Sequence, residues 1–155
     1  MNASQQLAKH LREIHFGGNW TCSNLKDHLS SLNWSLSLQQ VQNLNSIATL
    51  TVHSSYYVKV LKEVLEGKPL NSKDEYSFQL PLIQSQQDWE NLLETIWKNA
   101  EETASLLEQM PEEKLYDHFT EEKYGNYFRN IIGIVEHLHY HLGQIVLIKK
   151  LIQKP

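Results

Sequence analysis

Apolar residues recur every three or four positions along four long stretches of the chain, and this spacing predicts amphipathic helices. The first predicted helix covers about residues 3–14 and is stopped by the pair Gly17-Gly18. A short helical turn is expected between Asn19 and Asn33, with Ser23 as its N-terminal cap.

The second long helix is predicted to start after Ser37, because Ser37 and Gln40 match a capping box. It runs to Glu66, although the polar stretch QNLNS interrupts its first turns. Gly67 and Pro69 then end it, since glycine caps a helix C-terminus and proline cannot continue the helix.

Residues 68–84 are polar and lack helical period, so we expect a long crossover connection there. The third long helix starts near Ser85 and closes at Met110-Pro111, and the fourth runs from about Asn126 to Gln153. No stretch shows the alternation of a strand. The pattern therefore predicts an all-α fold, a four-helix bundle that forms a single domain over residues 1–155.

Composition and charge narrow the class of protein. A net charge of −4 argues against binding to nucleic acid or an anionic membrane. The sequence has no uninterrupted apolar run of about 18 residues, so we expect no membrane-spanning segment. The first residues lack the layout of a signal peptide, and the single cysteine, Cys22, cannot form an internal disulfide. We expect a cytoplasmic protein.

Three histidines fall within five positions of the last predicted helix, in the stretch EHLHYHLGQI. Each residue of an α-helix turns by about 100°, so His137 and His141 share one face whereas His139 points to the other side. The shared face lies on the apolar stripe between Ile134 and Ile145. The pair therefore interrupts the predicted core.

A buried imidazole needs partners for its ring nitrogens, and a metal ion bound by an i, i+4 pair meets that need. The pair by itself is a weak signal in a chain with eight histidines. His53 is the candidate third ligand, because Leu50 and Tyr57 place it on the inner face of the second helix. Three inward histidines would form a site with open coordination positions, but a hydrogen-bonded core histidine at position 53 fits equally well.

The remaining histidines are weaker candidates for a functional site. His10 is expected to be packed or at the rim of the core, and His15, His28 and His118 are expected to be solvated. Cys22 has no visible partner that would lower its pKa and activate it as a nucleophile.

Two segments, TVHSSYYVKVLKEVLEGKPL and NYFRNIIGIVEHLHYHLGQIVLIKKLI, resemble the DinB-like family of metal-binding helical bundles. The stretch FGGNWTCSNLKDHL is similar to the region that joins the first two helices of that family. The resemblance spans nearly the whole chain, and the combination of an upstream histidine with HxxYHxGQI is its most specific part.

This resemblance implies a bundle with up-down-down-up connectivity and a divalent metal, zinc or nickel, held by His53, His137 and His141. Tyr140 and Gln144 match accompanying positions of the family motif without being assigned as ligands. The resemblance also implies a homodimer.

Three functions remain open. In the first, the metal activates a low-molecular-weight thiol, which attacks an electrophile, so that the protein is an S-transferase. In the second, metal-bound water serves a hydrolase, but Glu136 is expected to face away and no carboxylate clearly faces the triad. The third is a non-catalytic metal-binding stress protein. No catalytic residue is assigned, and the 15–34 linker and 68–84 crossover are expected to roof the pocket.

Overall fold

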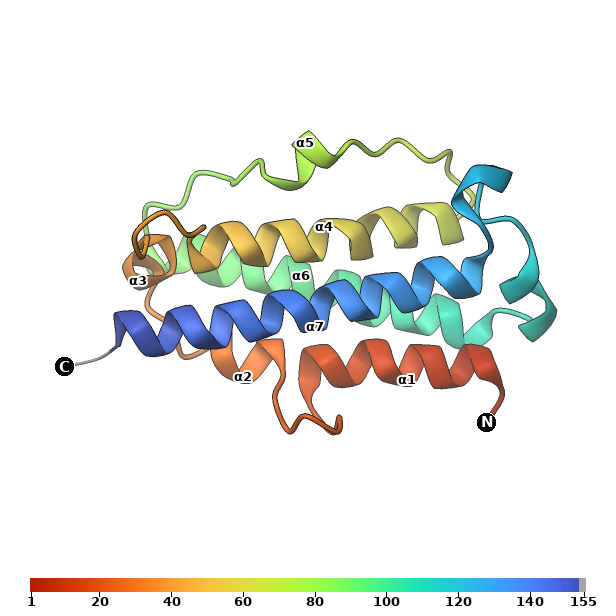
Figure 1. Ribbon diagram of the computed structural model, residues 1–155, viewed down its shortest axis with the longest axis horizontal. Helices are drawn as coiled ribbons and strands as arrows, with labels where there is room; N and C mark the ends of the chain where they lie inside the picture. The colour runs from red at the N-terminus through yellow and green to blue at the C-terminus, as the bar shows by residue number, and fades with distance from the viewer. Residues whose placement is uncertain (154–155) are drawn as a thin grey trace.

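The computed structural model describes residues 1–153, and it is built from helices (Figure 1). The α-helices and the two short 3-10 helices are, in chain order, α1 (Ala3–Phe16), α2 (Leu25–Leu29), α3 (Trp34–Leu38), α4 (Ile47–Leu65), α5 (Asp74–Ser77), α6 (Gln86–Gln109), η1 (Glu112–Tyr116), η2 (Glu122–Tyr124) and α7 (Tyr127–Ile152). No strand forms within residues 1–153. The all-α prediction is confirmed.

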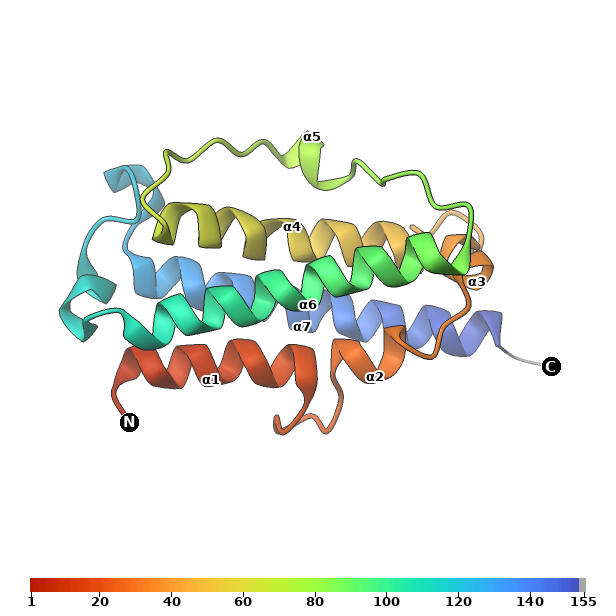
Figure 2. The same cartoon turned by 180° about the vertical axis from the view of Figure 1, so that it is seen from behind.

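The four long helices, α1, α4, α6 and α7, lie side by side (Figures 1 and 2). Helix α1 packs against α6 and α7, and α4 packs against the same two helices. Between α4 and α6 the chain crosses from one end of the molecule to the other along the outer side of α4. The expected long crossover is present, and it contains one unpredicted helical turn, α5.

The predicted starts of the last two long helices are close to those observed. The Ser85 hydroxyl accepts a hydrogen bond from the backbone N–H of Asp88, at 3.1 Å, and caps α6. Asn126 caps α7 in the same way by accepting from the N–H of Arg129, at 2.9 Å. Each cap satisfies a backbone donor that the first helical turn leaves unpaired.

The prediction of one continuous second helix from Ser37 to Glu66 is wrong. The chain forms α3, leaves helical geometry after Leu38, and starts α4 at Ile47. Ser46 is the cap of α4, with its hydroxyl 3.2 Å from the N–H of Thr49. Val41 and Leu44 are the two apolar residues between the helices, so burial of this segment offers little to keep it helical.

Asn24, rather than the predicted Ser23, caps α2 by accepting from the N–H of Asp27 at 2.9 Å. The Ser23 hydroxyl instead lies 2.9 Å from Nε2 of His28.

One cluster of buried apolar side chains runs through the centre of the four long helices. Helix α7 contributes a buried stripe with three- and four-residue spacing, namely Ile131, Val135, Leu138, Leu142, Ile145 and Ile148. Ile134, which the sequence placed on this stripe, is only partly buried. His141 lies beside this stripe and is also buried. The apolar contacts thus fix the rotation of α7 and, with it, the direction of its histidines.

Helix α7 has the length and mean hydropathy of a membrane-spanning helix, with a value of 1.3 over its apolar window. In this structure 39% of that window is buried inside the protein. The core helix of a soluble protein has the same length and composition, so this feature is weak evidence for a membrane span.

Candidate metal centre

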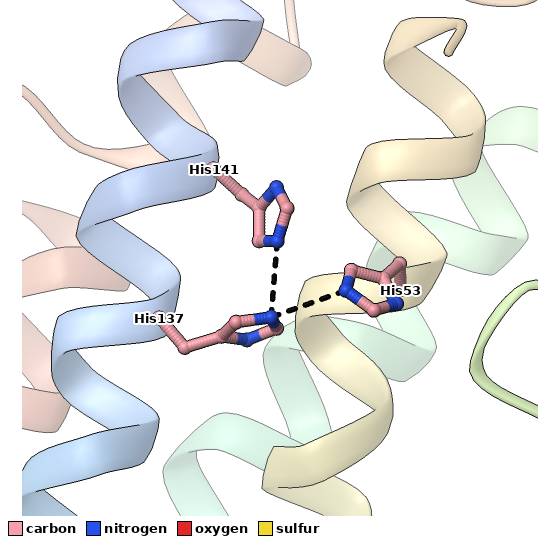
Figure 3. A group of neighbouring side chains, drawn as sticks. All are labelled: His53, His137 and His141. Atoms are coloured by element: carbon pink, nitrogen blue, oxygen red, sulfur yellow. Dashed lines mark hydrogen bonds between the residues drawn. The ribbon is translucent and has the colours of Figure 1, made fainter. Parts of the chain in front are cut away.

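Three histidine side chains converge between α4 and α7 (Figure 3). Nε2 of His137 lies 3.1 Å from Nε2 of His53 and 3.0 Å from Nε2 of His141. One ring nitrogen from each residue lies within 4.8 Å of the others. The structure therefore brings together the three residues that the sequence singles out, across 84 positions of the chain.

The spacing of these nitrogens suits a metal ion. In a tetrahedral zinc site with Zn–N bonds of about 2.0–2.1 Å, two ligand nitrogens lie about 3.3 Å apart. The two Nε2 separations that involve His137 are only a few tenths of an ångström shorter. A small outward movement of the rings would therefore admit an ion, and three nitrogens would leave further coordination positions open.

Hydrogen bonds at the far side of two rings direct their lone pairs inward. The Ser77 hydroxyl donates to the carbonyl of Asp74 at 2.6 Å, so its oxygen accepts from Nδ1 of His53 at 2.7 Å. Nδ1 of His141 donates to Oε1 of Gln144, also at 2.7 Å. A neutral imidazole with its proton on Nδ1 presents Nε2 as an acceptor or a ligand.

His137 has a different environment. Its Nε2 faces both neighbouring rings, whereas its Nδ1 is buried and has no hydrogen-bond partner among the described residues. Two nitrogen lone pairs, from His53 and His141, therefore point toward one central nitrogen that can donate to only one of them. The cluster lacks protons for a complete set of hydrogen bonds, and a cation at its centre would satisfy all three nitrogens.

The triad is electrically neutral near pH 7. Burial, together with the charges that His141 and His53 would carry, lowers the pKa of His137 to about 4. Burial also lowers the pKa of His53 and of His141. Neutral imidazoles are the form that binds metals, so the protein holds these side chains ready for coordination.

His139 points away from the cluster, as the helical geometry predicts. Its Nδ1 lies 3.0 Å from the carbonyl oxygen of Val135, one turn back on the same helix. It makes no contact that would place it in the triad.

Aromatic rings enclose the His53 side of the site. Phe78 stacks on the His53 ring, with centroids 4.1 Å apart and an angle of 18° between the planes. The edge of Tyr57 meets both His53 and His137. The Tyr57 hydroxyl donates to the carboxylate of Asp74, and burial together with this hydrogen bond raises the pKa of Tyr57 to about 12.

The sequence reasoning missed three residues beside the triad, which are Asp74, Ser77 and Phe78. All three belong to the 68–84 crossover, which covers the His53 side of the site as expected. No spacing within the crossover marks them, because they meet His53 only when the chain folds back along α4. The 15–34 linker does not share this position, since α2 packs against α1 and α7 on the side of the molecule opposite α5.

His15 was expected to be solvated, and that prediction is wrong. Helix α1 continues to Phe16, so His15 occupies its last turn and is fully buried. Its Nδ1 donates to the carbonyl of Leu11 at 2.7 Å, and burial lowers its pKa to about 4. His10 is exposed rather than packed, and Cys22 is exposed as well.

An open groove of about 740 Å³ leads along α7 to the triad. Its lining includes Tyr57 from α4 and His137, together with Arg129, Gly133 and Glu136 from α7. Glu136 was expected to face away from the site, but it lines the same groove as His137. A groove of this size suits a small molecule.

Searches of family models, curated proteins and solved structures find no match to this chain.

Proposed function

We propose that the chain is a divalent-metal-dependent enzyme of the DinB-like type, with His53, His137 and His141 as the ligands of zinc or nickel. The observation that carries the proposal is the convergence of three neutral imidazoles whose Nε2 atoms lie 3.0 and 3.1 Å apart. Two of the rings are oriented by hydrogen bonds from Nδ1 to Ser77 and Gln144, as the far nitrogen of a metal-binding histidine usually is.

The reaction that fits best is S-transfer from a low-molecular-weight thiol to a small electrophile. A divalent metal bound by the triad would supply a Lewis acid that favours the thiolate over the thiol. The chain itself contributes a neutral ligand set, an aromatic wall from Tyr57 and Phe78, and a groove that ends at His137. Its only cysteine, Cys22, is exposed, and the nucleophilic sulfur would come from the substrate.

Hydrolysis is the second candidate, and Asp74 is the observation in its favour. Burial lowers the pKa of His53 and of His137, and the charge of this carboxylate is close enough to oppose part of that lowering. However, it already accepts the hydroxyl proton of Tyr57, which leaves it less available as a general base for water. We therefore rank hydrolysis below thiol transfer.

The proposal also covers the architecture. In Figure 1, α1 and α7 run in one direction and α4 and α6 in the other, which supports a four-helix bundle with up-down-down-up connectivity.

A cytoplasmic homodimer is part of the same proposal. Three exposed apolar residues on one side of α7, Tyr140, Leu147 and Leu151, are the face through which we expect two copies to associate. Light scattering of the purified protein tests this association.

A fluorogenic electrophile such as monochlorobimane tests the reaction. We expect product only when the metal-loaded protein and a suitable thiol are both present, and a loss of at least about 100-fold for His137→Ala. His139→Ala is the matched control and should retain activity. Cleavage of ester or amide substrates without thiol would favour hydrolysis instead. Absence of turnover with either class, together with unfolding on chelation, would favour a structural metal.

A further inference from the structure

The groove beside the triad contains a cationic group without a protein partner. Arg129 lines the groove at the start of α7, is exposed, and forms no ion pair within residues 1–153. Arg12, the other arginine, forms ion pairs with Glu101 and Glu108. An arginine offers a planar fork of donors that matches a carboxylate, so Arg129 is available to a ligand in the groove.

Between Arg129 and His137 the floor of the groove is bare. Gly133 lies four residues from each of them, and a Cβ atom added there would meet no heavy atom within 4 Å. Eight residues of α-helix span about 12 Å. In this structure the arginine side chain lies beside Gly125, with its Cδ 3.0 Å from where a Cβ added to that glycine would sit, on the side away from His137. Turned toward Gly133, it would cover part of that span, and a molecule the size of a tripeptide would cover the rest.

Residues of opposite charge lie at the two ends of the groove. Glu136 lines the end next to His137, whereas Arg129 lines the far end. An anionic group on a substrate is therefore repelled from the triad end and attracted to the Arg129 end. The opposite end of the same molecule then lies at the three imidazoles.

We propose that this groove binds the thiol substrate, that this substrate carries a carboxylate, and that Arg129 binds the carboxylate while the sulfur lies at the histidine triad. The inference rests on the proposed thiol transferase and names its substrate class. Arg129 is the specificity-determining residue, and Gly133 keeps the path between the two ends open.

Binding of glutathione and of its diethyl ester, which keeps the amino group but lacks both carboxylates, to the cobalt-loaded protein tests this inference without measuring turnover. A thiolate bound to cobalt gives a charge-transfer band in the near ultraviolet, so the dissociation constant of each compound can be titrated. We expect the wild type to prefer glutathione by about five-fold, the upper range for an exposed ion pair, and to lose this preference in high salt.

Four variants separate the roles of the groove residues. Arg129→Gln is expected to abolish the preference for glutathione, and Arg129→Lys to restore part of it. Lys150→Gln removes one exposed charge from the far end of α7 and should leave the preference unchanged. Gly133→Leu fills the floor and should weaken binding of both compounds by about ten-fold or more, with cobalt content unchanged.

The outcomes distinguish the two proposals. Thiol binding with an Arg129→Gln variant that behaves like Lys150→Gln would overturn the assignment of Arg129 and leave the transferase proposal standing. Full binding by Gly133→Leu would show that the thiol does not occupy the groove. If no thiol binds to the cobalt-loaded wild type, the transferase proposal and this inference both fail.

Discussion

The three histidines of the triad differ in the hydrogen-bond partner of Nδ1. A serine from a distant segment holds His53, a glutamine one turn away holds His141, and no described residue holds His137. His137 nevertheless occupies the centre of the cluster, because its Nε2 faces both other rings. The individual contributions to metal binding should therefore be unequal.

Alanine substitution at each position tests this at the residue scale. We expect His137→Ala to lose bound metal after dialysis, because it removes the central nitrogen, and His53→Ala and His141→Ala to lose at least about ten-fold in affinity. Elemental analysis of the dialysed proteins measures the result. His139→Ala should retain a full complement of metal, and its loss there would contradict the orientation observed for this side chain.

The sequence predicts the three histidines that cluster here better than it predicts the residues that hold them in place. His137 and His141 share a face because of helix geometry alone, and Leu50 and Tyr57 orient His53 by the same rule. Ser77 was not predicted, since its contact with His53 depends on where a 20-residue connection folds back, and no local pattern encodes that. The prediction for His15 was wrong because α1 continues two residues beyond position 14, and His15 then lies in the core rather than in solvent.

At the scale of elements, the crossover between α4 and α6 acts as part of the site rather than as a passive link. Its single helical turn, α5, places Ser77 against His53, and Phe78 follows it and stacks on the same ring. Without the crossover, the His53 ring would lose the hydrogen bond at Nδ1 and the stacking contact, and would keep its contacts with Tyr57, His137 and His141.

Ser77→Ala should therefore reduce metal affinity by about 10- to 100-fold, the usual effect of losing the hydrogen bond that orients a metal-binding histidine. The helix content should be unchanged, because the hydroxyl does not support the core. Competition with a chromophoric chelator measures the affinity, and Ser72→Ala in the same segment is the control. Equal affinity for the two variants would mean that Ser77 does not orient His53.

The packing of the helices also explains why the predicted start of the second long helix was wrong. The sequence predicts α6 and α7 well because each has a clear cap and an unbroken apolar stripe. Residues Gln39 to Asn45 lack such a stripe. The match to a capping box at Ser37 therefore predicted a helix start that the polar residues after it do not support. Tertiary packing, which begins again at Ile47, decided where α4 starts.

For the whole molecule, buried neutral histidines make stability depend on pH. His15 has an ordinary pKa of 6.5 when unfolded and a pKa of about 4 when folded. Between these values the unfolded chain binds more protons than the folded one, so stability falls as the pH decreases from 6.5 toward 4. One such group accounts for about 1.4 kcal/mol per pH unit within this window.

We expect His15→Leu to flatten this dependence by about that amount. Urea unfolding of metal-free wild type and variant at several pH values between 4 and 7 measures the difference. The triad adds its own dependence to both proteins, so the comparison isolates His15. Equal slopes for the two proteins would mean that His15 is protonated in the folded state.

The unpartnered Nδ1 of His137 has a consequence for how the site fills. In the metal-free protein the single proton of this ring is best placed on Nε2, where it is shared with a neighbouring lone pair. Coordination through Nε2 obliges His137 to change tautomer and to carry its proton on a buried atom that no described residue accepts from. Loading should thus shift the ring's two ¹⁵N resonances in opposite directions, while scarcely changing the number of protons bound to the protein. A water molecule or a ligand group in the groove that accepts a hydrogen bond from Nδ1 of His137 would therefore strengthen metal binding.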